Sequence, residues 1–471
     1  MPNSFKPTHY LPSKYNGAFG MAKLFGSSGV RGLVNIDLTP ILACEMACAV
    51  ATHANAKKVI VAKDTRVSGN MLEEALISGA ISCGADVFLS GMIPTPVLAY
   101  TSRALGADVG LMLTASHNPA PYNGIKVFKG DLSYTGNDQD AVEKIMENCS
   151  YKWADWRNIG KSFHVDTSKI YLDMIMRVVK IERPWNVVID SGCGAAFDIA
   201  PRMFKNLGCK VISLNSQPDG QFPARKSEPT AESLRDLAKA VKILGADIGI
   251  GFDGDADRVA FVDENGVFIN FDRSLAAFSA FALKRKGGGK IVTTIEASMC
   301  VETMAEKYGG KVVRTKVGDV YVSEAIKREG AVFGGEPCGA WIHPEQHLCP
   351  DGLLSAAFFI ATAQNEGKTV SEIIETVPEY PNQRVNFTCK NELKYPLIEK
   401  LSELLKTAFP DFQDYSSLDG VRIVLENAWF LVRASGTEPL IRLTVEAKTT
   451  KAAKDITQKA TAIIQKQVEA N

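Results

Sequence analysis

Short apolar runs rich in Val and Ile alternate with helix-like stretches along most of the chain, and the same order of elements occurs three times. Each unit opens with a strand-like run: KKVIVAKDT (57–65), NVVIDSG (186–192) and GKIVTTIEAS (289–298). A second run follows a glycine in each unit, at Gly84, Gly208 and Gly309. Glycine commonly ends a helix because it adopts the left-handed conformation easily. The pattern therefore predicts a strand, a helix and a second strand in each unit.

A third strand-like run completes each unit and leads into a polar loop. These runs are GADVGLMLTASHNP (106–119), GADIGIGFDGDADR (245–258) and GAVFGGEPCG (330–339). Continuous apolar strands that alternate with helices are typical of a mainly parallel α/β sheet. Ligands of such sheets bind beyond the carboxyl ends of the strands. We therefore expect the chemistry of the protein to lie in these three loops.

The pattern changes from about residue 385. The runs 421–425, 428–439 and 440–447 are strand-like and are separated by short polar turns, and a helical tail follows them. This is typical of a smaller α+β domain, and a linker with two prolines at 376–383 precedes it. We predict three similar α/β domains with mixed, mainly parallel sheets and a C-terminal α+β domain. Their expected ranges are 23–155, 156–262, 263–376 and 385–471, after a flexible leader at 1–22.

The composition is that of an ordinary soluble protein. The 471 residues include 53 basic and 53 acidic side chains, so the net charge is zero, which argues against a protein that coats nucleic acid or a charged membrane. The longest nearly apolar stretch, 353–363, is shorter than a membrane helix requires. Ten cysteines without a CxxC pair favour a reducing compartment. We therefore expect a cytoplasmic protein that binds neither nucleic acid nor membrane.

Three aspartates alternate in the loop DGDADR, directly after an apolar strand. Asp253, Asp255 and Asp257 would repel one another without a cation, and hard divalent cations prefer such oxygen ligands. An overlapping GxGxxG pattern does not indicate a dinucleotide site, because two of the aspartates would face the pyrophosphate. A calcium loop is excluded as well, because Arg258 stands where that loop needs glycine. A solvated acidic turn is the simpler alternative, but three aspartates exceed what a turn needs.

The loop TASHNP offers a candidate nucleophile. Ser116 ends another buried strand, His117 is beside it, and Lys126 could reach the same place. A serine next to a histidine is more often an ordinary turn, so this motif is weak by itself. It differs from the GxSxG turn of hydrolases.

Two further segments combine small residues with arginine, as a phosphate-binding loop does. RASGTEP contributes Arg433, Ser435, Gly436 and Thr437, and Arg442 follows it. A hairpin turn would explain the serine and glycine of this segment but not the arginines. Near the N-terminus, SSGVRG places Arg31 behind small residues, where a glycine-rich turn is an equally good interpretation. Glu336, in the loop GGEPCGAW, could accept hydrogen bonds from sugar hydroxyls, or it is simply an acidic loop residue.

The order of these motifs resembles the α-D-phosphohexomutase superfamily. FGSSGVRG, TASHNP, DGDADR, GEPCG and RASGTEP occur in the family's order, and the resemblance runs from about Lys23 to the C-terminus. It implies four domains around a central cleft, each contributing one loop. It also implies an isomerase that interconverts 6-phospho and 1-phospho sugars through a phosphoserine enzyme and a bisphosphorylated sugar intermediate. The substrate would be a hexose or hexosamine phosphate, and the enzyme a monomer or homodimer.

The resemblance also implies a role for each motif. Ser116 would carry the phosphoryl group, and Mg²⁺ would be bound by a phosphoserine oxygen together with Asp253, Asp255 and Asp257. The transfer site would be lined by Arg31, His117, Lys126 and Arg258, with Lys126 as a candidate general acid or base. Glu336 and Cys338 would contact the sugar. The phosphate that does not react would be held by Arg433, Ser435, Gly436, Thr437 and Arg442.

The expected sugar follows from finer features of the motifs. The loop SGT and the opening KLFGSSGVRG resemble phosphoglucosamine mutases, particularly archaeal ones, which implies glucosamine 6-phosphate and glucosamine 1-phosphate. A phosphomannomutase or phosphoglucomutase with the same mechanism is the alternative. Cys338 stands where many relatives have Ser, and Ala340 where they have His, with His343 and His347 as candidates to compensate. A non-catalytic sugar-phosphate-binding protein or a metal-dependent phosphatase fits the motifs less well.

Overall fold

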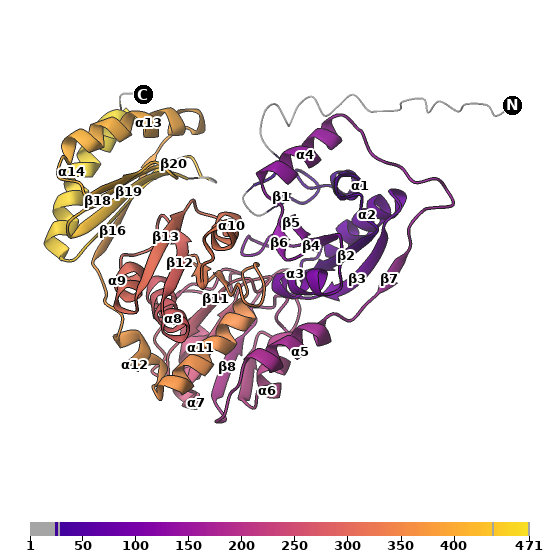
Figure 1. The fold of residues 1–471 in the computed structure, drawn as a ribbon, viewed down its shortest axis with the longest axis horizontal. Helices are drawn as coiled ribbons and strands as arrows, with labels where there is room; N and C mark the ends of the chain where they lie inside the picture. Colours follow the sequence, from indigo (N-terminus) through magenta and orange to yellow (C-terminus); the bar gives the residue numbers. More distant parts are fainter. Residues whose placement is uncertain (1–23, 27–28, 436–437, 470–471) are drawn as a thin grey trace.

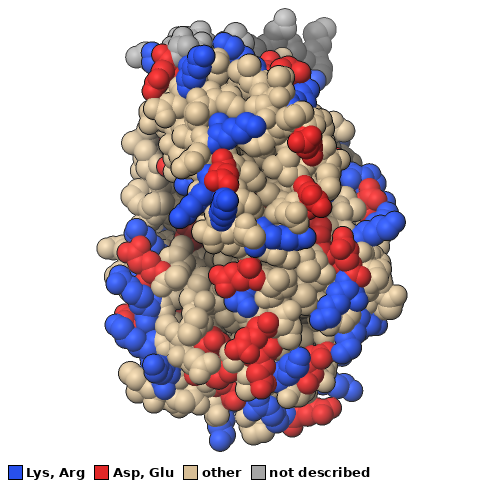
Figure 2. All heavy atoms as spheres, turned by 90° about the vertical axis from the view of Figure 1, so that its left-hand side faces the viewer, with Lys and Arg blue, Asp and Glu red and all other residues tan. Residues whose placement is uncertain are grey.

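Four β-sheets with their helices follow one another along the chain and form an arc (Figure 1). The computed structural model describes residues 24–26, 29–435 and 438–469. The first and the fourth sheets lie at the two ends of the arc, and the second and third lie between them. No helix among these residues is long and apolar enough to cross a membrane. Figure 2 shows basic and acidic side chains interspersed over the outer face of the end that carries the fourth sheet.

The first sheet has seven strands in the order β1-β5-β4-β2-β3-β7, with β6 beside β5. Its strands are β1 (Val30–Leu33), β2 (Lys58–Lys63), β3 (Asp86–Met92), β4 (Val109–Leu113), β5 (Tyr122–Lys129), β6 (Leu132–Ser133) and β7 (Ser162–His164). Its helices are α1 (Pro40–Ala54), α2 (Gly69–Ser82), α3 (Thr95–Ala104) and α4 (Gly136–Glu147). Strand β2 runs parallel to β3 and β4, whereas β5 is antiparallel to β4.

The second and third sheets have four strands each, in the orders β11-β10-β8-β9 and β13-β12-β14-β15. The strands are β8 (Asn186–Asp190), β9 (Lys210–Leu214), β10 (Ile248–Phe252), β11 (Val259–Val262), β12 (Gly289–Thr294), β13 (Gly310–Thr315), β14 (Phe333–Gly335) and β15 (Trp341–Ile342). The helices are α5 (Ser168–Val178), α6 (Ile199–Asn206), α7 (Arg235–Leu244), α8 (Phe271–Lys286), α9 (Cys300–Lys307), α10 (Asp319–Glu329), α11 (Gly352–Glu366) and α12 (Val370–Glu375).

The threefold repeat predicted from the sequence is confirmed. In each unit the first predicted strand lies between the second and the third, to both of which it is parallel, and an antiparallel strand follows the third. These antiparallel strands are β5, β11 and β15. The loop between the third strand and the antiparallel one therefore lies at the carboxyl ends of the parallel strands in each sheet. These are the three loops in which chemistry is expected.

The fourth sheet is wholly antiparallel, in the order β16-β20-β19-β18-β17. Its elements are β16 (Asn382–Thr388), α13 (Asn391–Ala408), β17 (Asp414–Ser416), β18 (Val421–Leu425), β19 (Ala428–Ala434), β20 (Leu440–Ala447) and α14 (Thr450–Glu469). The strands predicted at 421–425, 428–439 and 440–447 are found here, so the mixed α/β and terminal α+β classes are both confirmed.

Two strands extend their sheets past the ranges expected for the domains. Strand β7 pairs with β3, so the first sheet includes residues beyond position 155. Strand β16 begins at Asn382, within the predicted linker, and pairs with β20 along its whole length. Both strands lie at a sheet edge and are largely exposed, and β7 is only three residues long. Neither has an apolar run that marks a strand in the sequence.

The first three units pack as one body, and the fourth is attached through a smaller contact. One apolar core includes buried residues from the first three sheets and their helices, whereas the fourth sheet has a core of its own. Ile295, Trp429 and Leu431 form a small apolar cluster between the third and fourth units. Buried Glu446 accepts hydrogen bonds there from Ser298 Oγ at 2.5 Å and Trp429 Nε1 at 2.6 Å. The fourth unit is thus joined to the third by this apolar cluster and by the hydrogen bond from Ser298 to Glu446.

Candidate active site

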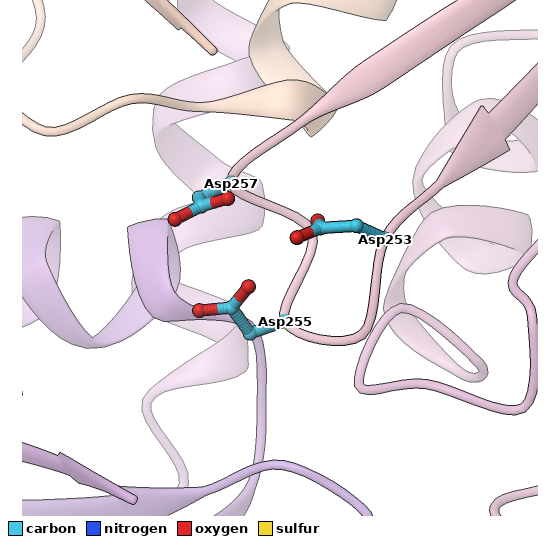
Figure 3. Close-up of side chains that lie close together, drawn as sticks. All are labelled: Asp253, Asp255 and Asp257. Carbon is cyan, nitrogen blue, oxygen red and sulfur yellow. The ribbon is translucent and has the colours of Figure 1, made fainter. Parts of the chain in front are cut away.

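The three aspartates of the loop between β10 and β11 point toward one another (Figure 3). Oxygen atoms of Asp253, Asp255 and Asp257 lie within 4.8 Å of one another, and all three side chains are buried. Asp255 Oδ1 and Asp257 Oδ1 have no hydrogen-bond partner. A buried carboxylate oxygen without a partner is costly, and a hard divalent cation would satisfy it. This donor set therefore fits Mg²⁺.

The electrostatics of the aspartate cluster favour a cation as well. Burial and the charges of Asp257 and Asp255 raise the pKa of Asp253 well above its ordinary value. Burial also acts to raise the pKa of Asp255, but the neighbouring ammonium of Lys126 outweighs it and lowers that pKa. Lys126 Nζ donates to Asp255 Oδ2 at 2.7 Å and to Asp257 Oδ2 at 2.6 Å. Lys126 and the aspartate loop are therefore in direct contact.

Ser116 lies directly against the aspartate cluster. It follows β4, its Oγ donates to Asp253 Oδ2 at 2.6 Å, and it is only 1% exposed. The two loops touch through their backbones at Gly254, where a Cβ atom would lie 2.5 Å from Ser116 O. Only glycine permits this approach. The nucleophile candidate and the metal-site candidate, which come from different units, therefore form one site.

His117 and two arginines lie around Ser116. His117 Nδ1 is 3.3 Å from Ser116 Oγ. Burial, together with the charges of Arg258 and Arg31, lowers the pKa of His117 to about 2, so its ring is neutral at physiological pH. Arg31 Nη1 donates to Asn118 Oδ1 at 3.1 Å, and the backbone N–H of Arg258 donates to Asp253 Oδ1 at 3.2 Å. Positive charge is thus gathered next to the serine.

Glu336 follows β14 in the equivalent loop of the third unit. Its Oε2 accepts a hydrogen bond from Gly318 N at 2.9 Å, and burial followed by the charge of Asp319 raises the pKa of Glu336 to about 7. Gly339 has a φ of +88° and lies so close to Val259 O that a side chain would not fit. This contact connects the loop of Glu336 and Cys338 to the strand that leaves the aspartate loop.

The two histidines that are candidates to compensate for Ala340 are both buried and hydrogen-bonded to other side chains. His343 is buried and its Nε2 lies 2.8 Å from Ser355 Oγ. His347 is buried as well, and its Nε2 lies 2.8 Å from Asp351 Oδ2. The chain turns inward after β15 to reach the N-terminus of α11, and the ring of His347 packs against Tyr100 of the first unit, with ring centres 5.9 Å apart.

A cavity of about 680 Å³ lies between the first, third and fourth units. Its polar and charged lining includes Arg31, Lys316, Asp419, Arg433, Ser435 and Arg442. Arg433 Nη1 lies 3.2 Å from Glu296 Oε2 and 3.7 Å from Asp419 Oδ2, and Arg442 pairs with Glu438. Four cationic side chains around one cavity are suited to a phosphorylated ligand. Arg31 lines this cavity and also contacts the serine loop, so the two regions are continuous.

A buried lysine holds the loop that follows β19. Lys394 Nζ, on α13, donates to Ser435 O at 2.5 Å and to Glu438 O at 2.9 Å. The side-chain oxygen of Ser435 accepts from Glu438 N at 3.2 Å. Gly436 and Thr437 lie outside the described residues. The loop is thus fixed from behind on both sides of these two positions.

Several residues of the site were missed in the sequence. Lys316 follows β13, where the rule of strand carboxyl ends would have indicated it. Thr95 donates to Asp255 Oδ2 at 2.5 Å, and nothing in its surroundings in the sequence suggests this. Arg66 follows β2 and contacts the serine loop, and it stands directly after the strand-like run 57–65, outside the segments that the sequence singles out.

The chain matches four family profiles in order. They are Phosphoglucomutase/phosphomannomutase alpha/beta/alpha domain I at residues 22–152, domain II at 169–266, domain III at 270–380 and the C-terminal domain at 385–463.

Relatives of known name agree with this match. The chain is 45% identical to a probable phosphoglucosamine mutase of Methanothermobacter thermautotrophicus, covering 92% of this chain and 96% of that one. A probable phosphoglucosamine mutase of Pyrococcus abyssi is 41% identical, with coverages of 94% and 98%. The crystal structure of a phosphoglucomutase/phosphomannomutase family protein from Burkholderia thailandensis superimposes with a TM-score of 0.85 at 27% identity, covering 94% and 98%. The chain therefore belongs to the phosphoglucomutase/phosphomannomutase family.

Proposed function

We propose that this enzyme interconverts glucosamine 6-phosphate and glucosamine 1-phosphate. The observation that carries the proposal is the hydrogen bond from Ser116 Oγ to Asp253, within a buried acidic cluster and beside a cationic cavity. Phosphoryl transfer requires such positioning and charge neutralisation. The choice of sugar rests on relatives at 41% and 45% identity that are named probable phosphoglucosamine mutases.

In the proposed reaction Ser116 carries a phosphoryl group. A sugar hydroxyl oxygen attacks its phosphorus, the bond from phosphorus to Ser116 Oγ breaks, and a sugar bisphosphate forms. The bisphosphate then returns its other phosphoryl group to Ser116. Each half-reaction moves one proton from the attacking hydroxyl to the leaving oxygen, and Lys126 is the proposed carrier. Mg²⁺, held by Asp253, Asp255, Asp257 and a phosphoserine oxygen, would neutralise charge on the transferring group.

Other residues would bind the sugar and its second phosphate. Glu336 and Cys338 are proposed to contact the sugar, while Arg31, His117 and Arg258 are proposed to surround the transferring group. Arg433, Ser435, Gly436, Thr437 and Arg442 are proposed to hold the phosphate that does not react. Lys394 supports this role for the loop, because it fixes the carbonyls of Ser435 and Glu438 from behind. We place the enzyme in a reducing cytoplasm, in keeping with its ten free cysteines.

The proposal is tested by a coupled assay of glucosamine 6-phosphate, mannose 6-phosphate and glucose 6-phosphate at equal concentrations. We expect kcat/KM to be highest for glucosamine 6-phosphate. A preference for mannose or glucose phosphate would make the enzyme a phosphomannomutase or phosphoglucomutase instead. Release of inorganic phosphate in place of the isomer would indicate a phosphatase, and turnover of none of the three would contradict the proposal.

A further inference from the structure

Ser116 has a backbone conformation that needs external support. Its φ is +50°, in the left-handed region that residues with a side chain rarely adopt. Such a conformation costs free energy and persists only where the surrounding structure enforces it. The contacts that enforce it also determine where the serine oxygen lies.

Arg66 supplies one of these contacts and also holds the carbonyls that follow in the loop, while Ser227 Oγ of the second unit donates to the same Ser116 O at 3.1 Å. Its side chain is buried behind the loop, and Nη2 donates to Ser116 O at 2.9 Å and to Asn118 O at 2.7 Å. Nη1 donates to Pro119 O at 2.7 Å and to Tyr122 O at 2.8 Å. Nε donates to the buried carboxylate of Asp64 at 3.0 Å. All five N–H donors of the guanidinium are thus in use, four of them on backbone carbonyls of residues 116–122.

The same carboxylate holds the other side of Ser116. Thr114 Oγ1 donates to Asp64 Oδ2 at 2.7 Å and accepts a hydrogen bond from Ser116 N at 2.9 Å. Asp64 is therefore linked to Ser116 in two ways. Thr114 connects it to the backbone N–H of Ser116, and Arg66 connects it to the backbone carbonyl of Ser116. Both peptide groups of the serine are fixed by one buried ion pair.

The segment that carries this ion pair also contacts the second unit. Thr65 Oγ1 donates to Cys193 O at 2.9 Å, and the guanidinium of Arg66 lies 5.1 Å from the ring centre of Phe222. A Cβ atom on Gly220 would lie 2.4 Å from Thr65 O, so the backbones are in contact. The segment thus fixes the serine loop relative to the unit that carries the aspartates.

We infer that Arg66, held by Asp64, is a positioning residue for phosphoryl transfer. It keeps Ser116 Oγ at Asp253, and it is not among the described residues that line the cavity. The inference rests on the proposed function. Lysine cannot replace it, because an ammonium has three donors and no planar fork.

The test compares Arg66→Lys with the wild-type enzyme and with Arg422→Lys. Arg422 is another buried arginine, on β18, far along the chain from the serine loop. We expect Arg66→Lys to lower kcat about 100-fold, because a small displacement of a reacting group has effects of that order. KM for the sugar phosphate should stay within about twofold of wild type, since the binding residues are untouched. Arg422→Lys should change neither value by more than about twofold.

A second variant keeps the inference testable if Arg66→Lys does not fold. Thr114→Val removes the hydrogen bond to Ser116 N while keeping the shape of the side chain, and we expect kcat to fall about 10-fold. Each variant is incubated with hexose 1,6-bisphosphate, and intact mass gives the fraction of molecules that carry phosphoserine. The measured kcat is divided by this fraction, which gives kcat per competent molecule. Wild-type kcat per competent molecule, or a loss confined to thermal stability, would overturn the inference. An inactive wild-type enzyme would instead overturn the proposed function.

Discussion

The serine loop of the first unit and the loop after β19 in the fourth unit differ in how their charged groups are held. Ser116 is 1% exposed and both of its peptide groups are fixed by buried side chains. Arg433 and Arg442 are 18% and 47% exposed in their side chains, and each is paired with carboxylates that a ligand could replace. One region is buried and fixed by hydrogen bonds, whereas the other is partly exposed and held by ion pairs.

This difference corresponds to the two tasks of the proposed reaction. A transfer site gains rate when its groups are preorganised and shielded from water. A phosphate-binding site that must accept either end of a bisphosphate gains from partners that exchange. Lys394, only 4% exposed, fixes the backbone of the second loop, while the arginines of this region are partly exposed and paired with carboxylates that a phosphate could replace. Substitutions in each loop test whether the two loops have separate roles of this kind.

The largest effect is expected from Ser116→Ala. Without the hydroxyl no phosphoserine forms, so kcat should fall by at least about 1,000-fold. The coupled assay measures the rate, and intact mass should show no added phosphoryl group after incubation with hexose 1,6-bisphosphate. Ser168→Ala, at the first residue of α5, is the matched control and should behave as wild type. Mutase activity near the wild-type level in Ser116→Ala would exclude this serine as the phosphoryl carrier.

Much of this comparison follows from the sequence, because the loops lie where strand order places them. The β-branched runs and the glycines after the helices identified the repeated units, and each polar loop followed its third strand. The clustering of Asp253, Asp255 and Asp257 depends only on alternation within one loop. Long-range partners were not predictable. Nothing in the sequence pairs Arg66 with the carbonyls of residues 116–122, and this contact appears only when strands β2 and β4 are side by side.

The same limit explains the other differences between sequence and structure. His343 and His347 are candidates to compensate for Ala340 because they stand close to it in the sequence. The turn after β15 instead buries both, and Asp351 at the start of α11 binds His347. Lys394 and Glu296 stand far in the sequence from the loop that they contact, on α13 and after β12. Their roles depend on how the fourth unit docks, which no local pattern encodes.

An intermediate effect is expected from Arg433→Ala. The phosphate that does not react is bound alike in the ground state and in the transition state, so its loss should raise KM and leave kcat near wild type. A charge-assisted hydrogen bond contributes about 1.5–3 kcal/mol, which corresponds to an increase in KM of about 10- to 150-fold. Initial rates over a range of glucosamine 6-phosphate concentrations separate the two constants. An unchanged KM, or a fall in kcat alone, would mean that this arginine does not hold the fixed phosphate.

The smallest effect is expected from Glu296→Gln. This substitution should lower KM, whereas Arg433→Ala should raise it. Glu296 Oε2 lies 3.2 Å from Arg433 Nη1, so a phosphate must compete with this carboxylate for the guanidinium. An ion pair that is partly exposed contributes up to about 1 kcal/mol, so removing the charge should lower KM by up to about fivefold. The effect should shrink as ionic strength rises, because salt screens the pair. Glu306→Gln on α9 is the control and should leave KM unchanged. A higher KM in Glu296→Gln would show instead that this carboxylate helps to orient Arg433 for phosphate, and the second loop would then be as preorganised as the first.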